Sequence, residues 1–302
     1  MDLANWMSAI PEEKRVLPLN HLFIPGSHNS LTATLDANGP LAGDCPETVK
    51  CLSQCLPIKP IIHRWSVTQS LPVRDQLDTG IRYLDLRVGV PPDTDEVRIC
   101  HGLYGDLIEE VLLQILEFLT EHPEEVVLLD FNHFYDFTDA THTKLINILT
   151  SLFDTNLCPP MHLAEVTLES LKSYKYQAIV FYQDATQIAK SAPLWPKSSI
   201  KAPWANTDSQ AELLEFLGET LNKRPQTPPG FFVSQGVLTP QNCDVISRMC
   251  GSLKPLAASC TEAVISWLRS SFGDISSNLN VVICDFVELH EFSQTVIELN
   301  YL

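Results

Sequence analysis

The sequence predicts an α/β fold, a single irregular (β/α)8-like barrel that takes up residues 1–302 as one domain. First, short apolar and β-branched runs alternate with helical patterns along the chain. Second, most of these runs, such as VVLLDF and VVICDF, are apolar on both faces, as strands of a parallel sheet covered on each side must be. Third, no composition break, linker or internal repeat divides the chain, which favours one closed barrel over two domains.

Eight short runs are expected to form the strands, each because it is apolar and rich in β-branched residues. The first leads into a Pro-Gly turn, and the sixth is the weakest. In chain order the expected strands are Leu22–Pro25, Arg82–Val88, Arg98–His101, Val126–Phe131, Ala178–Tyr182, a weak strand near Ile200–Ala202, Phe231–Gly236 and Val281–Phe286.

Helices are expected where apolar residues recur with a helical period between these strands. They are Leu107–Glu121, Ala140–Phe153, Ser209–Lys223, Thr261–Phe272 and Glu291–Asn300, with one more near Pro46–Cys55. No helical pattern separates Val88 from Arg98, which is one reason to expect an irregular barrel.

The charge of the chain excludes one class of partner. Twenty Lys and Arg stand against 37 Asp and Glu, which gives a formal charge of −17. A dense phosphate surface would be repelled, so no nucleic acid partner is expected, and the case for a membrane-surface protein is weakened. With 45% hydrophobic and 19% charged residues, the chain has ample material for a buried core.

The N-terminus and the cysteines suggest a compartment. No basic leader precedes an apolar stretch, and no apolar segment reaches the ~18 residues of a spanning helix. The nine cysteines are an odd number without a CxxC pair, which argues against a disulfide framework and a structural zinc site. We therefore expect reduced thiols in a cytoplasmic or nuclear protein that is neither secreted nor membrane-spanning.

Candidate catalytic residues follow from one rule of barrels, that active sites form at the carboxyl ends of the strands. Polar side chains occur at four predicted strand ends. Because side chains alternate with a period of two, Asp85 and Arg87 should point to the same face. The set expected to converge is His28, Asn29, Asp85, Arg87, His101 and Asp285.

These residue types match the needs of phosphodiester cleavage. Two histidines, with an ordinary pKa near 6.5, can remove a proton from the attacking hydroxyl and protonate the leaving oxygen. A carboxylate such as Asp285 can orient one imidazole. Arg87 supplies a permanently charged fork for the phosphoryl oxygens, as a metal otherwise might.

Seven motifs in order carry a resemblance to a known family. They are IPGSHNS, RWSVTQSL (Arg64–Leu71), LDTGIRYLDLRV, ICHGLYG, HPEEVVLLDFNHF, PWANT and NVVICDFVELHEF. The chain resembles the phosphatidylinositol-specific phospholipase C, X-domain-containing protein family from residue 5 to 300. More distantly, it is similar to the bacterial phosphatidylinositol phospholipases C.

The resemblance implies an irregular TIM barrel that cleaves phosphatidylinositol or a related inositol phosphodiester through a cyclic phosphate. By motif, His28 is similar to the general base and Asp285 to the carboxylate that orients it. His101 is similar to the general acid, and Arg87 to the phosphate clamp that makes calcium unnecessary. Asp85 is similar to the carboxylate two residues before that arginine.

Two departures from the family pattern affect these expectations. The bacterial enzymes have Asp where this chain has Asn29, so the partner expected for His101 is uncharged. Calcium-dependent relatives have an acidic ligand where this chain has Arg87. Phe131 and Asn132 of this chain lie near the position at which those relatives carry a Glu and the bacterial enzymes a Lys. We therefore expect no metal or other cofactor, with calcium as the disfavoured alternative, and an acid–base pair that is weakened.

Several residues keep a structural interpretation beside the functional one. Arg87 and Asp85 could form a structural ion pair, and Asp285 could cap the helix near Glu291. Tyr182 and Trp204 could stack on an inositol ring or be core or rim aromatics. For Asp130, His133 and Trp65 packing is the favoured interpretation.

Three functions follow in order of preference. The first is a metal-free phosphoric diester hydrolase of the phospholipase C type with transient membrane contact at most. The second is an inositol phosphate-binding module that turns over poorly, and Asn29 motivates it. The third is a metal-dependent glycerophosphodiesterase, which the Asp85-Leu-Arg87 pattern disfavours because such a site needs several oxygen ligands.

Overall fold

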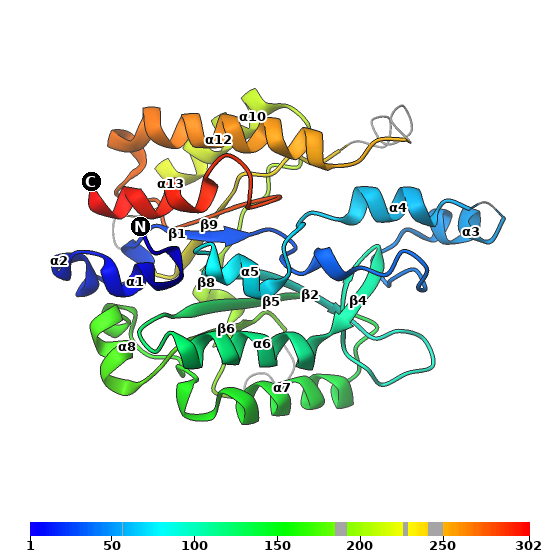
Figure 1. Ribbon diagram of the computed structural model, residues 1–302, viewed down its shortest axis with the longest axis horizontal. Coiled ribbons are helices and arrows are strands. Elements are labelled where there is room, and N and C mark those ends of the chain that lie inside the picture. Colours follow the sequence, from blue (N-terminus) through cyan, green and yellow to red (C-terminus); the bar gives the residue numbers. More distant parts are fainter. Residues whose placement is uncertain (56, 185–191, 226–228, 241–249) are drawn as a thin grey trace.

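Eight parallel strands form a nearly closed, TIM-like barrel (Figure 1). The computed structural model describes residues 1–302 except 56, 185–191, 226–228 and 241–249. The strands follow the order β7-β6-β5-β2-β1-β10-β9-β8, so the seam of the barrel lies between β7 and β8. Their bounds are β1 Ile24–Ser27, β2 Tyr83–Gly89, β5 Val127–Tyr135, β6 Ala178–Tyr182, β7 Trp195–Pro196, β8 Ile200–Lys201, β9 Phe231–Gln235 and β10 Val281–Cys284.

Strand alternation divides the core into two layers. Residues such as Leu128, Ile179 and Ile283 pack in the cluster that fills the barrel. Their neighbours Leu129 and Val180 belong to the cluster between strands and helices. The runs that are apolar on both faces therefore do form parallel strands, as the sequence predicts.

The helices cover the barrel from outside, and all predicted helical segments are helical. Figure 1 shows α6 and α7 along one side and α10, α12 and α13 along the other. Short α4, α5 and α8 were not predicted. The bounds are α1 Trp6–Ala9, α2 Glu12–Arg15, α3 Glu47–Cys55, α4 Lys59–Ser66, α5 Val73–Asp78, α6 Ile108–Glu121, α7 Asp139–Phe153, α8 Leu168–Tyr174, α10 Gln210–Asn222, α12 Lys254–Ile275 and α13 Phe292–Glu298.

The predicted third barrel strand is wrong in its role. Arg98–His101 forms β3, which pairs antiparallel with β2 and with β4 (Leu103–Leu107), while β2 pairs directly with β5 in the barrel. The hairpin turns at Gly102, whose φ of +70° favours glycine and whose missing Cβ avoids the Ser66 hydroxyl. His101 therefore approaches the barrel mouth from a hairpin and not from a barrel strand.

A buried ion pair closes the opposite end of the barrel. The side chains of Arg82 and Glu125 are 0% and 1% exposed, with Nη2 2.8 Å from the carboxylate. The guanidinium also donates to the carbonyls of Leu77 at 2.7 Å and Ala4 at 2.7 Å. Glu125 in turn accepts the N–H of Ser8 at 3.1 Å, so the pair joins the N-terminal segment to the barrel base.

The structure bears on two features considered from the sequence, membrane-spanning helices and cysteines. Across the described residues, no helix combines the length and apolar character needed to cross a membrane. Seven cysteines are free thiols, with Cys100 and Cys284 buried as expected. Cys243 and the side chain of Cys55 lie outside the described part of the chain.

Candidate active site

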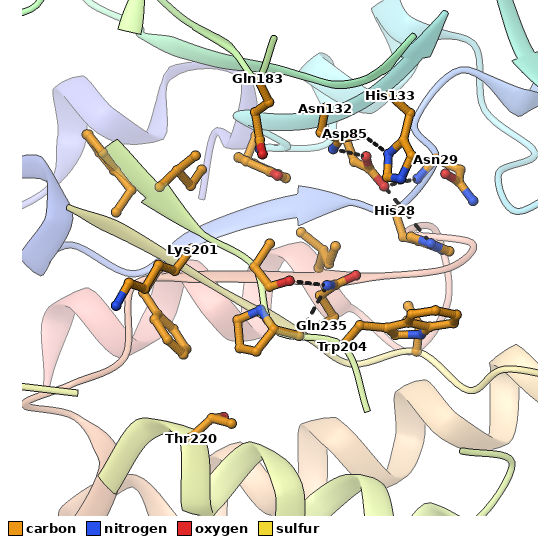
Figure 2. A pocket seen from close by; sticks show the side chains of 18 of the residues that line it. His28, Asn29, Asp85, Asn132, His133, Gln183, Lys201, Trp204, Thr220 and Gln235 are labelled. Carbon is orange, nitrogen blue, oxygen red and sulfur yellow. Dashed lines mark hydrogen bonds and ion pairs between the residues drawn. The ribbon is translucent and has the colours of Figure 1, made fainter. Parts of the chain in front are cut away.

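A cavity of about 1050 Å³ opens at the carboxyl ends of the barrel strands (Figure 2). All six predicted catalytic residues line it, as does Trp204. Lys197, Lys201 and Lys223 also line it and add positive charge in a chain of net charge −17.

His28 and Asp285 meet because their strands are in register. Ser27 at the end of β1 pairs with Cys284 at the end of β10, so the next residue of each strand lies beside the other. Asp285 Oδ1 is 2.7 Å from His28 Nδ1. Asp285 therefore orients an imidazole, and it is not the cap of α13, whose N-cap residue Glu291 makes no side-chain capping bond.

The chain bends sharply just after both residues. Asn29 and Phe286 have φ values of +41° and +50°, which are left-handed conformations. Asn tolerates this region, whereas it is an outlier for a bulky residue such as Phe and marks local strain. The bends turn the backbone away and leave the His28 and Asp285 side chains at the mouth.

Gln69 holds the two strand ends together. Its Nε2 donates to the carbonyls of His28 at 2.9 Å and Cys284 at 3.0 Å, and its Oε1 accepts the N–H of Val287 at 3.1 Å. The neighbouring Thr68 carbonyl accepts the N–H of Phe286 at 2.7 Å. Sequence reasoning missed this role, because a contact made from a loop leaves no periodic pattern in the sequence.

Asp85 and Arg87 share one face of β2, as predicted, but they are not ion-paired with each other in the described structure. Asp85 accepts the N–H of Asn29 at 2.8 Å and the amide of Asn132 at 2.5 Å, and it lies 4.0 Å from His28 Nε2. Burial alone would raise the pKa of Asp85, but the charges of Arg87 and His28 together with the hydrogen bonds from Asn132 and Asn29 lower it. Arg87 Nε is buried without a hydrogen-bond partner.

His101 is held by a backbone carbonyl. Its Nδ1 lies 2.7 Å from the carbonyl of Ser66 on α4, which assigns the proton to Nδ1. Its Nε2 lies 3.3 Å from Asn29 Nδ2, while Asn29 Oδ1 is buried without a partner. Burial, and then the charge of Arg87, lower the pKa of His101.

A β-bulge brings two further residues into the pocket. Leu86 pairs with Phe131 and the next residue, Arg87, pairs with His133, so Asn132 is the extra residue of β5. Both Asn132 and His133 line the cavity, and His133 Nδ1 lies 2.7 Å from Asn132 Oδ1 (Figure 2). His133 thus lines the mouth, and its ring also stacks on Tyr135 at the rim, with ring centroids 6.1 Å apart. Regular alternation would have turned one of these two side chains away.

The aromatic residues considered from the sequence take different positions in the structure. Tyr182 is not among the pocket residues; it faces the helix layer, where its hydroxyl lies 2.8 Å from His142 Nδ1, so its predicted place at the substrate is wrong. Trp204 lines the cavity with 55% of its surface exposed, and stacking by it stays a prediction. Trp65 packs beside Phe286 as expected and also lines the pocket.

The donor set of this site does not fit a hard divalent cation. Such an ion takes six or more oxygen ligands, usually with several carboxylates. Here Asp85 already accepts two hydrogen bonds, and the positive Arg87 lines the same pocket. Within the described ranges, no cluster of three or more His, Cys, Asp or Glu is arranged to hold a metal ion.

Comparison with known proteins gives the family. The sequence model described as "Phosphatidylinositol-specific phospholipase C, X domain" matches residues 62–184. "PI-PLC X domain-containing protein 2" of Mus musculus is 40% identical over 304 residues, covering 99% of this chain and 88% of that protein. "PI-PLC X domain-containing protein 3" of Homo sapiens is 38% identical over 308 residues, covering 100% and 95%. The chain belongs to the PI-PLC X domain-containing protein family.

Membership of the PI-PLC X domain-containing family confirms the resemblance carried by the seven motifs. Solved structures agree on the fold. The phosphatidylinositol-specific phospholipase C from Listeria monocytogenes has a TM-score of 0.69 at 16% identity, covering 99% of both chains. A Staphylococcus aureus phosphatidylinositol-specific phospholipase C with an altered residue has a TM-score of 0.71 at 16% identity. The nearly closed TIM-like barrel is therefore shared with bacterial enzymes of this type.

Proposed function

We propose that this PI-PLC X domain-containing protein is a metal-independent phosphoric diester hydrolase that cleaves phosphatidylinositol or a related inositol phosphodiester as a phospholipase C does. One observation carries the proposal. His28 and His101 line the same pocket with each Nδ1 bound to a fixed acceptor, so proton transfer falls to the Nε2 atoms, of which that of His28 lies 4.0 Å from Asp85 and that of His101 lies 3.3 Å from the Asn29 amide. The buried, unpartnered Nε of Arg87 beside them lacks only an anionic acceptor.

The proposed reaction begins with attack of the inositol 2-hydroxyl on phosphorus. His28 Nε2 accepts the hydroxyl proton, while Asp285 stabilises the imidazolium that forms. The bond from phosphorus to the leaving oxygen breaks, and His101 Nε2 gives that oxygen its proton. Arg87 binds the phosphoryl oxygens, and the product is an inositol 1,2-cyclic phosphate that water can open in a second step.

Arg87 also affects the acid. Burial and the Arg87 charge both lower the pKa of His101, which makes its protonated form a stronger acid but reduces its share at neutral pH. Asn29 can meet both states of His101, because its amide donates to neutral Nε2 and, turned over, would present its unpartnered Oδ1 to the protonated ring.

The test uses purified protein and phosphatidylinositol vesicles in EDTA. We expect release of inositol cyclic phosphate by the wild type and loss of at least about 10²-fold in rate for His28→Ala, the scale of general base catalysis. His162, an exposed histidine outside the pocket, provides the matched control His162→Ala. Activity that survives His28→Ala, or that requires calcium, would overturn the mechanism.

A second candidate is an inositol phosphate-binding module with poor turnover. It is favoured by the uncharged Asn29 amide on His101, which gives the protonated acid no carboxylate support. In Asn29→Asp, a carboxylate beside the imidazole should raise the pKa of His101 and move the alkaline limb of the rate profile to higher pH. If neither form cleaves any diester while both bind inositol 1-phosphate, the binding module is the better description.

The net charge of −17 affects how the protein would reach a substrate in a membrane. An acidic protein gains no general attraction to an anionic leaflet, so we propose brief, salt-insensitive membrane contact or a soluble diester as substrate. A cytoplasmic setting remains part of this proposal. Strong sedimentation with anionic vesicles at low salt that is lost at high salt would contradict it.

A further inference from the structure

A buried carboxylate below the pocket has no part in the chemistry described above. Asp130 on β5 is 0% exposed and lies opposite Asp85 of β2 and Phe181 of β6 in the sheet register. It points into the barrel, where the sequence had favoured rim packing, but it is not among the residues that line the cavity. Its contacts, however, are with two residues that do line it, Tyr83 and Gln183.

Those contacts fix the orientation of one amide. Gln183 Nε2 donates to both oxygens of Asp130, at 2.7 and 3.0 Å, and the Tyr83 hydroxyl donates to Oδ2 at 2.7 Å. An ionised carboxylate only accepts, so the Gln183 amide nitrogen must face Asp130. Ionised Asp130 offers the Gln183 oxygen no donor, whereas an uncharged acid or amide at this position has one and would let the Gln183 amide turn over.

The carbonyl oxygen of Gln183 is left for the cavity. Figure 2 shows Gln183 reaching into the pocket from the end of β6, on the same side as Asp85 and Asn132. An amide oxygen accepts hydrogen bonds and repels phosphate oxygens, so it is chemically matched to a hydroxyl. A substrate hydroxyl would donate a hydrogen bond to this Gln183 oxygen, and Asp130 prevents the amide from turning its nitrogen toward the substrate instead.

We propose that Asp130 is a positioning residue that holds Gln183 so that its carbonyl oxygen accepts a hydrogen bond from a ring hydroxyl of a polyol phosphodiester. The inference rests on the proposed function and adds to it the feature of the substrate that is recognised, namely a free hydroxyl on the headgroup at this wall. Neither residue takes part in proton transfer or in phosphate binding.

Two substrates separate recognition from chemistry. Phosphatidylinositol carries the inositol ring hydroxyls, whereas 2-hydroxypropyl 4-nitrophenyl phosphate undergoes the same cyclisation with no hydroxyl besides the attacking one. For Gln183→Leu and Asp130→Asn we expect kcat/KM on phosphatidylinositol to fall about tenfold, the scale of one lost hydrogen bond to a polar partner, and to stay within about twofold on the aryl diester. Equal losses on both substrates, or no loss on either, would overturn the proposal.

The double variant tests whether Asp130 acts through Gln183. With leucine at position 183, Asp130→Asn should cause no further loss on phosphatidylinositol, because the group it positions is gone. Two losses that multiply would show an independent, structural role for Asp130 and contradict the inference. Thermal unfolding of each variant checks that it is folded.

A binding experiment tests this inference even if the proposed function fails. If the wild type cleaves neither substrate, the proposed function fails, and titration calorimetry with inositol 1-phosphate and glycerol 3-phosphate then decides about Gln183. We expect Gln183→Leu to weaken inositol 1-phosphate about tenfold and glycerol 3-phosphate by less than twofold. Equal weakening of the two ligands, or none, would overturn the inference.

Discussion

Each end of the barrel holds an arginine beside carboxylates, Arg82 fully buried at the base and Arg87 half-buried at the mouth, and the two differ in how completely the arginine is paired. At the base, Arg82 Nε and Nη2 bind Glu125 at 2.9 and 2.8 Å, and the remaining donors reach backbone carbonyls. At the mouth, Arg87 Nε is buried with no partner, and Asp85 next to it makes its hydrogen bonds to Asn29 and Asn132 instead.

We interpret this difference as one between a structural site and the proposed active site. A buried charge is costly unless it is paired, so the base is complete without any ligand and ties the N-terminal segment to the barrel. The mouth retains unpartnered polar atoms on Arg87 and Asn29. Such atoms call for an explanation in a folded protein, and the proposed function offers one for Arg87, a substrate phosphate that accepts from its Nε.

Removing each arginine in turn gives the largest expected effect. Arg82→Met leaves Glu125 buried and unpaired, and we expect the free energy of unfolding to fall by about 3–5 kcal/mol. Arg87→Met removes a group with an unsatisfied nitrogen, and we expect a change within about 1 kcal/mol together with loss of activity. Urea denaturation measures both, and equal destabilisation would remove the distinction between base and mouth.

Asp130 sharpens the comparison because it is a buried carboxyl whose hydrogen bonds come from Tyr83 and Gln183 and not from an arginine. Burial raises its pKa from 3.8 to about 7. The folded state then keeps a proton that the unfolded state has lost, so stability falls as pH rises from about 4 to about 7 and levels off above that.

Relative to Asp130→Asn, which does not titrate, the wild type should lose about 1.4 kcal/mol of unfolding free energy per pH unit between pH 5 and 7. Urea denaturation of both proteins at pH 5, 6, 7 and 8 provides the data. A difference between the two proteins that is constant over this range would show that Asp130 is ionised throughout.

Gln69 tests how the mouth is held. Gln69→Met keeps the side-chain volume but removes hydrogen bonds to His28, Cys284 and Val287, and we expect a loss of about 1–3 kcal/mol. Because these bonds place the His28 backbone, kcat should fall more than KM rises. A stable variant with unchanged kcat would mean that the strand register alone places His28 and Asp285.

His133 is expected to give the smallest effect. It contacts Asp85 only through Asn132, so His133→Ala should lower kcat/KM less than about tenfold. Steady-state kinetics on phosphatidylinositol, compared with His28→Ala, measures this. A loss as large as that of His28→Ala would make His133 a member of the acid–base pair.

Much of the barrel could be predicted because parallel strands buried on both faces have a recognisable composition. The same signal misplaced Arg98–His101, because an apolar run does not reveal its direction or its partner, and the antiparallel pairing depends on the turn at Gly102. The two-residue β7 is too short to leave any pattern. The single-domain organisation stays a prediction.

The six predicted catalytic residues line one pocket because strand ends and a period of two are simple geometric rules. The prediction that Tyr182 contacts the substrate was wrong because of the same alternation of side chains. Its neighbours Phe181 and Gln183 face the barrel interior, so Tyr182 faces the helices. Asn132 and His133 depended on a bulge, and the clamp by Gln69 depended on a loop. Neither a bulge nor a loop contact has a reliable signal in one sequence.

The central claim is that His28 and His101 cleave an inositol phosphodiester by attack of its own hydroxyl, and the first product tests this most directly. Wild-type protein is mixed with phosphatidylinositol in EDTA and followed by ³¹P NMR from the earliest time points. We expect the inositol 1,2-cyclic phosphate resonance to appear before any inositol monophosphate, and neither with His28→Ala. Monophosphate as the first product, or no product from the wild type, would contradict the account.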